Sequence, residues 1–254
     1  MQPFVVASEA DARGLLNELI VQSVFERAVI GLDFETTGCN PQVETPVGKA
    51  RVWCMTVAWG EPAEQTPSPF KTAFVPRDYL EHFRLWLECP AYEKVGTNLF
   101  GFDRHACKNE GIELRGVHAC TTAMSRLLNP SKSWGHGLDD LGQEMGYPVK
   151  QGKYKLLTTV ASPGPEHRKR EWACPCCVIA YLRQRKLCKL CKLPVVEITT
   201  ATWTDVVWEQ KELTELWERY PEKRAEIVAY ATQDPAMSLD AFHLLKRKLA
   251  DVKW

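Results

Sequence analysis

The feature that most constrains this chain is residues 30–38, with the sequence IGLDFETTG. An apolar, β-favouring run leads to a glycine-containing turn, which predicts a buried strand over residues 28–35. Alternate side chains of a strand share a face, so Asp33 and Glu35 point the same way, with Cα atoms roughly 6.7 Å apart. Two like charges on a core strand are costly unless a cation joins them, and a divalent metal is the simplest candidate. The alternative is an edge strand whose two acids are solvated.

Composition limits the classes to which the chain can belong. With 45% hydrophobic and 25% charged residues it is ordinary for a soluble globular protein. No apolar run approaches the roughly 20 residues that span a bilayer, which predicts no membrane association. The N-terminus carries Glu9 and Asp11 and lacks a basic-then-apolar pattern, so neither a signal nor a transit peptide is expected. We therefore expect a cytoplasmic protein that is not secreted.

Five of the ten cysteines are packed into 18 residues, which is unlike a disulfide framework. Four of them form two CxxC pairs separated by ten residues: Cys174, Cys177, Cys188 and Cys191. This spacing predicts one structural, tetrahedral Zn²⁺ site in a reducing compartment, in which Cys176 could replace a neighbour. The alternatives are a redox pair or unligated thiols. Zinc would supply the folding energy of so small an element, on the order of 10 kcal/mol.

The charge of the chain is unevenly distributed. The whole sequence is neutral, but residues 166–192 carry a net charge of +6 and the remainder −6. Our hypothesis is that this basic segment grips nucleic-acid phosphates. The alternatives are a solvated basic knuckle and a docking surface for another protein.

The order of the predicted elements indicates an α/β domain with an insertion. Residues 1–160 plus 198–254 are predicted to form the main domain, and residues 161–197 an inserted basic zinc-binding element. Strands are expected at 3–7, 28–35, 50–59, 72–75 and 94–96. Helices are expected after a capping-box-like Ser8 and at 77–88, 100–110, 121–128, 138–145, 205–219, 222–232 and 235–250.

Two further acids lie where elements begin or end. Asp103 lies in the first turn of a predicted helix and follows Phe102; the alternative is an ordinary helix-dipole acid. Tyr230 and Asp234 are four residues apart, so on one helix a phenol would lie beside a carboxylate. The alternative there is a core tyrosine and a helix-breaking Asp-Pro step. Pro235 removes a helix amide, so the helix is expected to kink or restart at Asp234.

Taken together, these stretches resemble the DEDD superfamily of 3′→5′ exonucleases. Asp33-x-Glu35 matches the first motif, Asn98-x3-Phe102-Asp103 the second, and Tyr230-x3-Asp234 the third in its tyrosine form. The resemblance covers residues 28–160 and 205–250 and is nearest to the proofreading domain of family A DNA polymerases, with RNase D more distant. The helix start at residues 136–141, HGLDDL, also looks like one that those domains carry between the second and third motifs.

The resemblance implies a fold, a mechanism and a set of site residues. The fold would be α/β, an RNase H-like mixed central sheet flanked by helices. Glu35 and Tyr230 would orient the attacking water, and Asn98, Phe102 and Thr36 would contact the terminal nucleotide. Two Mg²⁺ or Mn²⁺ ions would be bound by four acids, Asp33, Glu35, Asp103 and Asp234. Independently of the resemblance, phosphodiester hydrolysis suits two ions about 3.5–4 Å apart on hard oxygen ligands.

The function expected is therefore a 3′→5′ exonuclease that releases nucleoside monophosphates from DNA, as in proofreading of single-stranded 3′ ends. The chain ends about 20 residues after Asp234, so we expect no polymerase domain to follow and a separate DNA polymerase or replication protein as partner. The alternatives are an RNase D-like exoribonuclease acting on RNA and a non-catalytic module that binds nucleic acid or a polymerase.

Overall fold

The computed structural model describes residues 2–37, 51–64, 67–132, 135–147, 157–174, 179–181, 192 and 196–252. They form two compact units, one of residues 1–157 with 212–254 and one of residues 158–211. The second unit is longer at both ends than the predicted insertion. No helix in the described ranges is both long enough and apolar enough to cross a membrane.

The first unit is built on a six-stranded mixed sheet in the order β1-β4-β3-β2-β5-β6. β2 pairs antiparallel with β3 and parallel with β5, so it lies in the middle of the sheet. This arrangement is compatible with the expected RNase H-like fold, and it excludes the solvated edge strand considered for residues 30–38. The strands are β1 (Phe4–Val5), β2 (Ile30–Thr37), β3 (Arg51–Trp59), β4 (Lys71–Pro76), β5 (Lys94–Gly96) and β6 (Val117–Cys120).

Side chains alternate across β2 as a period of two requires. Ile30, Leu32 and Phe34 are buried in the core formed with α1. Gly31 is on the other face, where an added Cβ would meet Pro235 and Leu239 of α9. Asp33 and Glu35 share that second face by the same alternation, as the sequence predicted.

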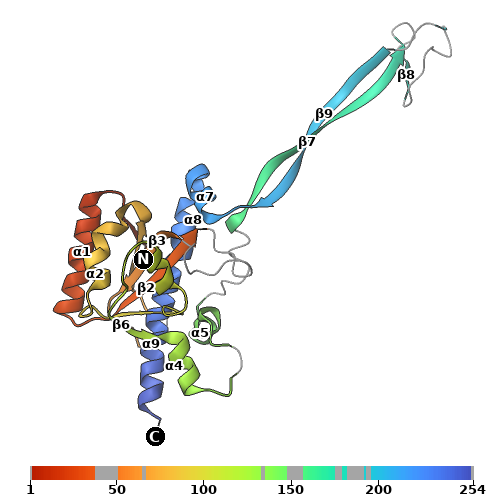
Figure 1. The fold of residues 1–254 in the computed structure, drawn as a ribbon. Coiled ribbons are helices and arrows are strands. Elements are labelled where there is room, and N and C mark those ends of the chain that lie inside the picture. The colour runs from red at the N-terminus through yellow and green to blue at the C-terminus, as the bar shows by residue number, and fades with distance from the viewer. Residues whose placement is uncertain are drawn as a thin grey trace. The chain divides into compact units, whose positions relative to one another are not determined.

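Helices cover both faces of the sheet (Figure 1). α1 (Glu9–Val24) begins at the predicted Ser8, whose Oγ accepts the amide of Asp11 at 3.1 Å. α9 (Gln233–Ala250) packs along β2, β3 and β5 and against α4 and α5. The other helices of the unit are η1 (Arg77–Phe83), α2 (Arg84–Glu88), α3 (Asp103–Asn109), α4 (Thr121–Leu128), α5 (Leu138–Glu144), α7 (Leu213–Arg219), η2 (Pro221–Lys223) and α8 (Arg224–Ala231).

The second unit is a three-stranded antiparallel sheet dominated by a long ribbon. It contains β7 (Thr159–Cys174), β8 (Ile179–Tyr181) and β9 (Val196–Gln210). The helix predicted over 205–219 is wrong in its first half, because β9 continues to Gln210 and α7 begins at Leu213. Residues 196–208, VEITTATWTDVVW, are rich in β-branched and aromatic residues and pair with β7, which outweighs the helical spacing.

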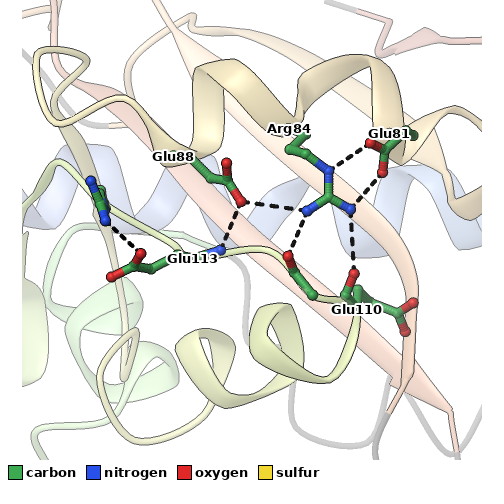
Figure 2. A network of polar contacts seen from close by, with 7 residues as sticks. Glu81, Arg84, Glu88, Glu110 and Glu113 are labelled. Carbon is green, nitrogen blue, oxygen red and sulfur yellow. Dashed lines mark hydrogen bonds and ion pairs between the residues drawn. The ribbon is translucent and has the colours of Figure 1, made fainter.

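A network of polar contacts around the partly exposed Arg84 fixes the loop that follows α3 (Figure 2). The Arg84 guanidinium donates to both carboxylate oxygens of Glu81, at 2.6 and 2.7 Å, and to the Gly111 carbonyl at 2.5 Å. Glu88 accepts from Arg84 and from the backbone amide of Glu113, at 3.4 and 3.1 Å. Because the contacts join α2 to residues 111–113, they hold that loop in one conformation.

Candidate metal centre

Three of the predicted acids converge in space although they come from distant parts of the sequence. Asp33, Glu35 and Asp234 each offer a carboxylate oxygen, and these atoms lie within 4.8 Å of one another. All three side chains are half-buried, so water or a substrate can reach them. Two come from the central strand β2 and the third from the first turn of α9.

The fourth acid, Asp103, lies near this cluster, because the charges of Glu35 and Asp234 act on it. It lies in the first turn of α3 and is only 2% exposed. Its Oδ1 accepts the backbone amide of Phe34 at 3.2 Å, and Phe34 is the residue between the two acids of β2. The hydrogen bond therefore fixes the start of α3 against the strand at the point where the other acids gather.

The carboxylates of the site are close enough for their negative charges to raise the pKa of neighbouring groups. Burial, and then the charges of Glu35 and Asp234, raise the pKa of Asp103 to about 7, although hydrogen bonds from the Phe34 and Asp103 amides oppose the rise. Burial and the charges of Glu35 and Asp33 likewise raise the pKa of the Cys54 thiol, which faces Glu35 across the β2–β3 pairing. A divalent cation would reverse the shift of Asp103, because it stabilises the ionised carboxyl.

The donor set fits hard divalent cations. All four side chains offer only carboxylate oxygens, which suit Mg²⁺ or Mn²⁺ better than the softer metals. Asp33, Glu35 and Asp234 are close enough to share an ion. Asp103 is near enough to feel the charges of Glu35 and Asp234.

The approach of α9 to β2 depends on Gly31, which was not among the predicted site residues. A Cβ on Gly31 would lie 2.4 Å from the Pro235 carbonyl oxygen and 3.2 Å from the Leu239 Cβ. Real Cβ atoms do not come that close to backbone, so only glycine lets α9 bring Asp234 beside the strand. The signal was present in the sequence, because a glycine inside a strand pattern marks a close approach of another backbone.

The helix break predicted at Asp234 is present two residues earlier, at Thr232, between two helices. α8 ends at Ala231 and α9 starts at Gln233, with Tyr230 near the end of the first and Asp234 in the first turn of the second. Pro235 also lies in that first turn, where a backbone amide has no helical acceptor, so its missing N–H costs no hydrogen bond. Tyr230 is half-buried, four residues before Asp234.

The three residues predicted to contact the substrate are close in sequence to the acids. The structure gives the burial and the backbone position of each. Asn98 is exposed with φ of 59°, and its carbonyl accepts the amides of Gly101 and Phe102, so it is a turn residue. Phe102 is half-buried immediately before α3. Thr36 is half-buried on β2, just beyond an irregularity in the pairing with β3.

The predicted zinc ligands are not described as a site. Cys177, Cys188, Cys191 and the substitute Cys176 lie outside the described residues. Cys174 is the last residue of β7, and its backbone pairs with Ile179 of β8. The first CxxC pair thus starts at the end of a strand, and the zinc site remains a prediction.

Comparison with curated proteins finds DNA polymerases of plants, while no family model matches. The chain is 25% identical to "DNA polymerase I A, chloroplastic" of Oryza sativa subsp. japonica over 259 aligned residues, which cover 98% of this chain and 22% of the relative. It is 30% identical to "DNA polymerase I B, mitochondrial" of the same plant over 146 residues, covering 54% and 14%. With "DNA polymerase I B, chloroplastic/mitochondrial" of Arabidopsis thaliana the identity is 28%, covering 48% and 12%. The chain thus spans less than a quarter of the length of these relatives.

A solved structure shares the fold over nearly the whole chain. It is described as the POL domain of Pol1 from M. smegmatis in complex with DNA primer-template and dNTP. The TM-score is 0.50 at 12% identity, covering 97% of this chain and 27% of that one. The plant relatives are named as chloroplast and mitochondrial proteins, so the comparisons give no support to the cytoplasmic expectation.

Proposed function

We propose that this chain, which is related to a region of DNA polymerase I, is a metal-dependent 3′→5′ exonuclease of the DEDD type in its tyrosine form. The observation that carries the proposal is the meeting of Asp33, Glu35 and Asp234 within 4.8 Å, with Asp103 bound to the strand between the first two. The motif resemblance and the relationship to DNA polymerases support it. The same relatives make DNA the proposed substrate and replication the proposed setting.

The chemistry assigns a task to each side chain of the centre. Asp33, Glu35, Asp103 and Asp234 would hold two divalent ions, which supply an activated hydroxide and stabilise the departing oxyanion. Asp103 is fixed by the Phe34 amide, so the start of α3 is held in position for binding. Glu35 and Tyr230 would orient the attacking water, as in the family that the motifs resemble. The half-buried surface of the three other acids admits a terminal phosphodiester.

The test is an assay on 5′-labelled single-stranded DNA and RNA of equal sequence. With Mg²⁺, we expect stepwise shortening of the DNA from its 3′ end with release of nucleoside monophosphates, and no shortening in EDTA. Preferential shortening of RNA would instead support an RNase D-like enzyme. Binding without shortening of either polymer would contradict the nuclease proposal and favour a non-catalytic nucleic-acid or polymerase-binding module.

We also propose that Cys174, Cys177, Cys188 and Cys191 bind one structural zinc ion, on the strength of their spacing. The purified chain should contain about one equivalent of zinc by atomic absorption. The double variant C188S/C191S should lose it, because two of four thiolates are removed. C89S is the matched control, since Cys89 is a free, half-buried cysteine of the first unit. Full zinc content in C188S/C191S would refute the assignment.

A further inference from the structure

A groove of about 530 Å³ lies along α3, the helix whose first residue is Asp103. Arg104, the residue after Asp103, lines it together with Lys108, one helical turn further on. Phe100 lines it as well and is 52% exposed, so its ring is accessible to a ligand. The other lining residues are His105, Gly111, Ile112, Glu113 and Leu114.

The lining of the groove is preformed, because part of it is apolar and buried and part is held by hydrogen bonds. Ile112 and Leu114 are only 2% and 4% exposed and belong to the hydrophobic core, so this part of the lining is firmly packed. The loop that carries them is held at Gly111 and Glu113 by the Arg84 network (Figure 2). A ligand therefore meets a wall that is already in place and need not be ordered on binding.

The charge at the rim is positive. The side chains of Arg104 and Lys108 are exposed and make no hydrogen bond or ion pair with the residues that the structure describes. The acid of the lining, Glu113, is paired with Arg115 at 2.6 Å, and the nearby charge of Arg104 also helps to lower the pKa of Glu113. Side chains four apart on a helix lie on one face, with Cβ atoms about 5–6 Å apart. Two cations are thus aligned along the groove with an exposed aromatic ring beside them.

We propose that this groove binds the single strand of nucleic acid on the 5′ side of the nucleotide being removed. A base would stack on Phe100 and successive phosphates would contact Arg104 and Lys108, the combination of aromatic platform and basic track that single strands favour. The proposal rests on the proposed function for its direction, since the 3′ end would lie at the acids that include Asp103. It extends that function by naming a strand-holding surface outside the metal centre.

The test measures binding without catalysis. The probe is a fluorescein-labelled oligothymidylate of about ten nucleotides, titrated in EDTA at about 50 and 200 mM salt with anisotropy as the readout. The variant R104Q/K108Q should weaken binding about tenfold at the lower salt. Its salt slope should also fall by about 1.4, because two phosphate contacts on a single strand are lost.

Two further variants separate the stacking contribution from the phosphate contacts. F100A should weaken binding about fivefold or more at both salt concentrations while leaving the slope unchanged, since stacking releases no counterions. The matched control is R247Q/K248Q, which removes two exposed cations from the last turn of α9 and should bind as the unchanged chain does. All substituted side chains are exposed, so their unfolding temperatures should stay within about 2 °C. If the double variant unfolds, the single substitutions should each give half of the slope change.

The outcomes distinguish this inference from the proposed function. Groove variants that match the control in Kd and slope, or an unchanged chain that does not bind the oligonucleotide, overturn the groove. If the chain shortens DNA but the groove substitutions do not change DNA binding, the nuclease proposal is supported and only this inference is refuted. If the groove substitutions weaken DNA binding but no DNA is shortened in Mg²⁺, the strand-binding surface is supported and the nuclease proposal is refuted.

Discussion

Replacing Asp33 or Asp234 by asparagine is expected to reduce Mg²⁺-dependent shortening of single-stranded DNA by about a thousandfold or more. Each substitution removes a negative ligand from a cluster whose oxygens lie within 4.8 Å of one another. The loss of even one preorganised stabilising group costs on the order of 10²–10³ in rate, and a missing metal ligand adds weaker ion binding to that cost. The measurement is the initial rate at saturating Mg²⁺, followed by the dependence on Mg²⁺ concentration.

The same variants should keep their fold, which separates lost chemistry from lost structure. Asparagine matches aspartate in shape, and removing one of several crowded charges relieves repulsion, so in the absence of metal the unfolding temperature should be unchanged or higher. D139N is the matched control, because Asp139 is an exposed acid of α5 outside the cluster. It should retain full activity. Equal activity in D33N, D234N and D139N would show that the acid cluster is not a catalytic metal centre.

Replacing Gly31 by alanine is expected to lower the free energy of unfolding by about 1–3 kcal/mol, because the added methyl overpacks a site with no room for it. Its Cβ would meet the Pro235 carbonyl at 2.4 Å, so α9 must move away from β2 or the strand must bend. Either movement shifts Asp234 relative to Asp33. A displacement near 1 Å can cost on the order of 10²-fold in rate, so activity should fall further than stability suggests.

Gly14 provides the control for this substitution. It is an exposed glycine within α1, and a Cβ there meets nothing within 4 Å. Alanine favours the helix over glycine by roughly 0.5–1 kcal/mol, so G14A should be more stable than the unchanged chain and equally active. Denaturant unfolding of both variants, with activity measured under native conditions, checks the pair. A G31A variant that behaves as G14A would contradict the close approach of α9.

Much of the local structure followed from residue patterns alone. The alternation of Ile30, Leu32 and Phe34 with Asp33 and Glu35 predicted a buried strand with two acids on one face, and the structure has that strand. A restart of the helix at Asp234 was predicted from the chemistry of proline, and the new helix begins one residue earlier, at Gln233. The prediction of a helix over the first half of 205–219 was wrong. These residues have a mixed local preference, and their pairing with β7 makes them a strand.

For the candidate site too, some features followed from the sequence and others only from the tertiary structure. Sequence by itself determined which acids are available, their order and which two share a strand face, because these depend only on residue identity and on the period of a strand. Tertiary structure alone decided that Asp103 bonds to the Phe34 amide, that Gly31 admits α9, and that Arg104 and Lys108 line a groove with Phe100. These contacts join residues up to about 200 positions apart. They exist only when the sheet and helices pack, since packing rather than local preference sets distances between remote side chains.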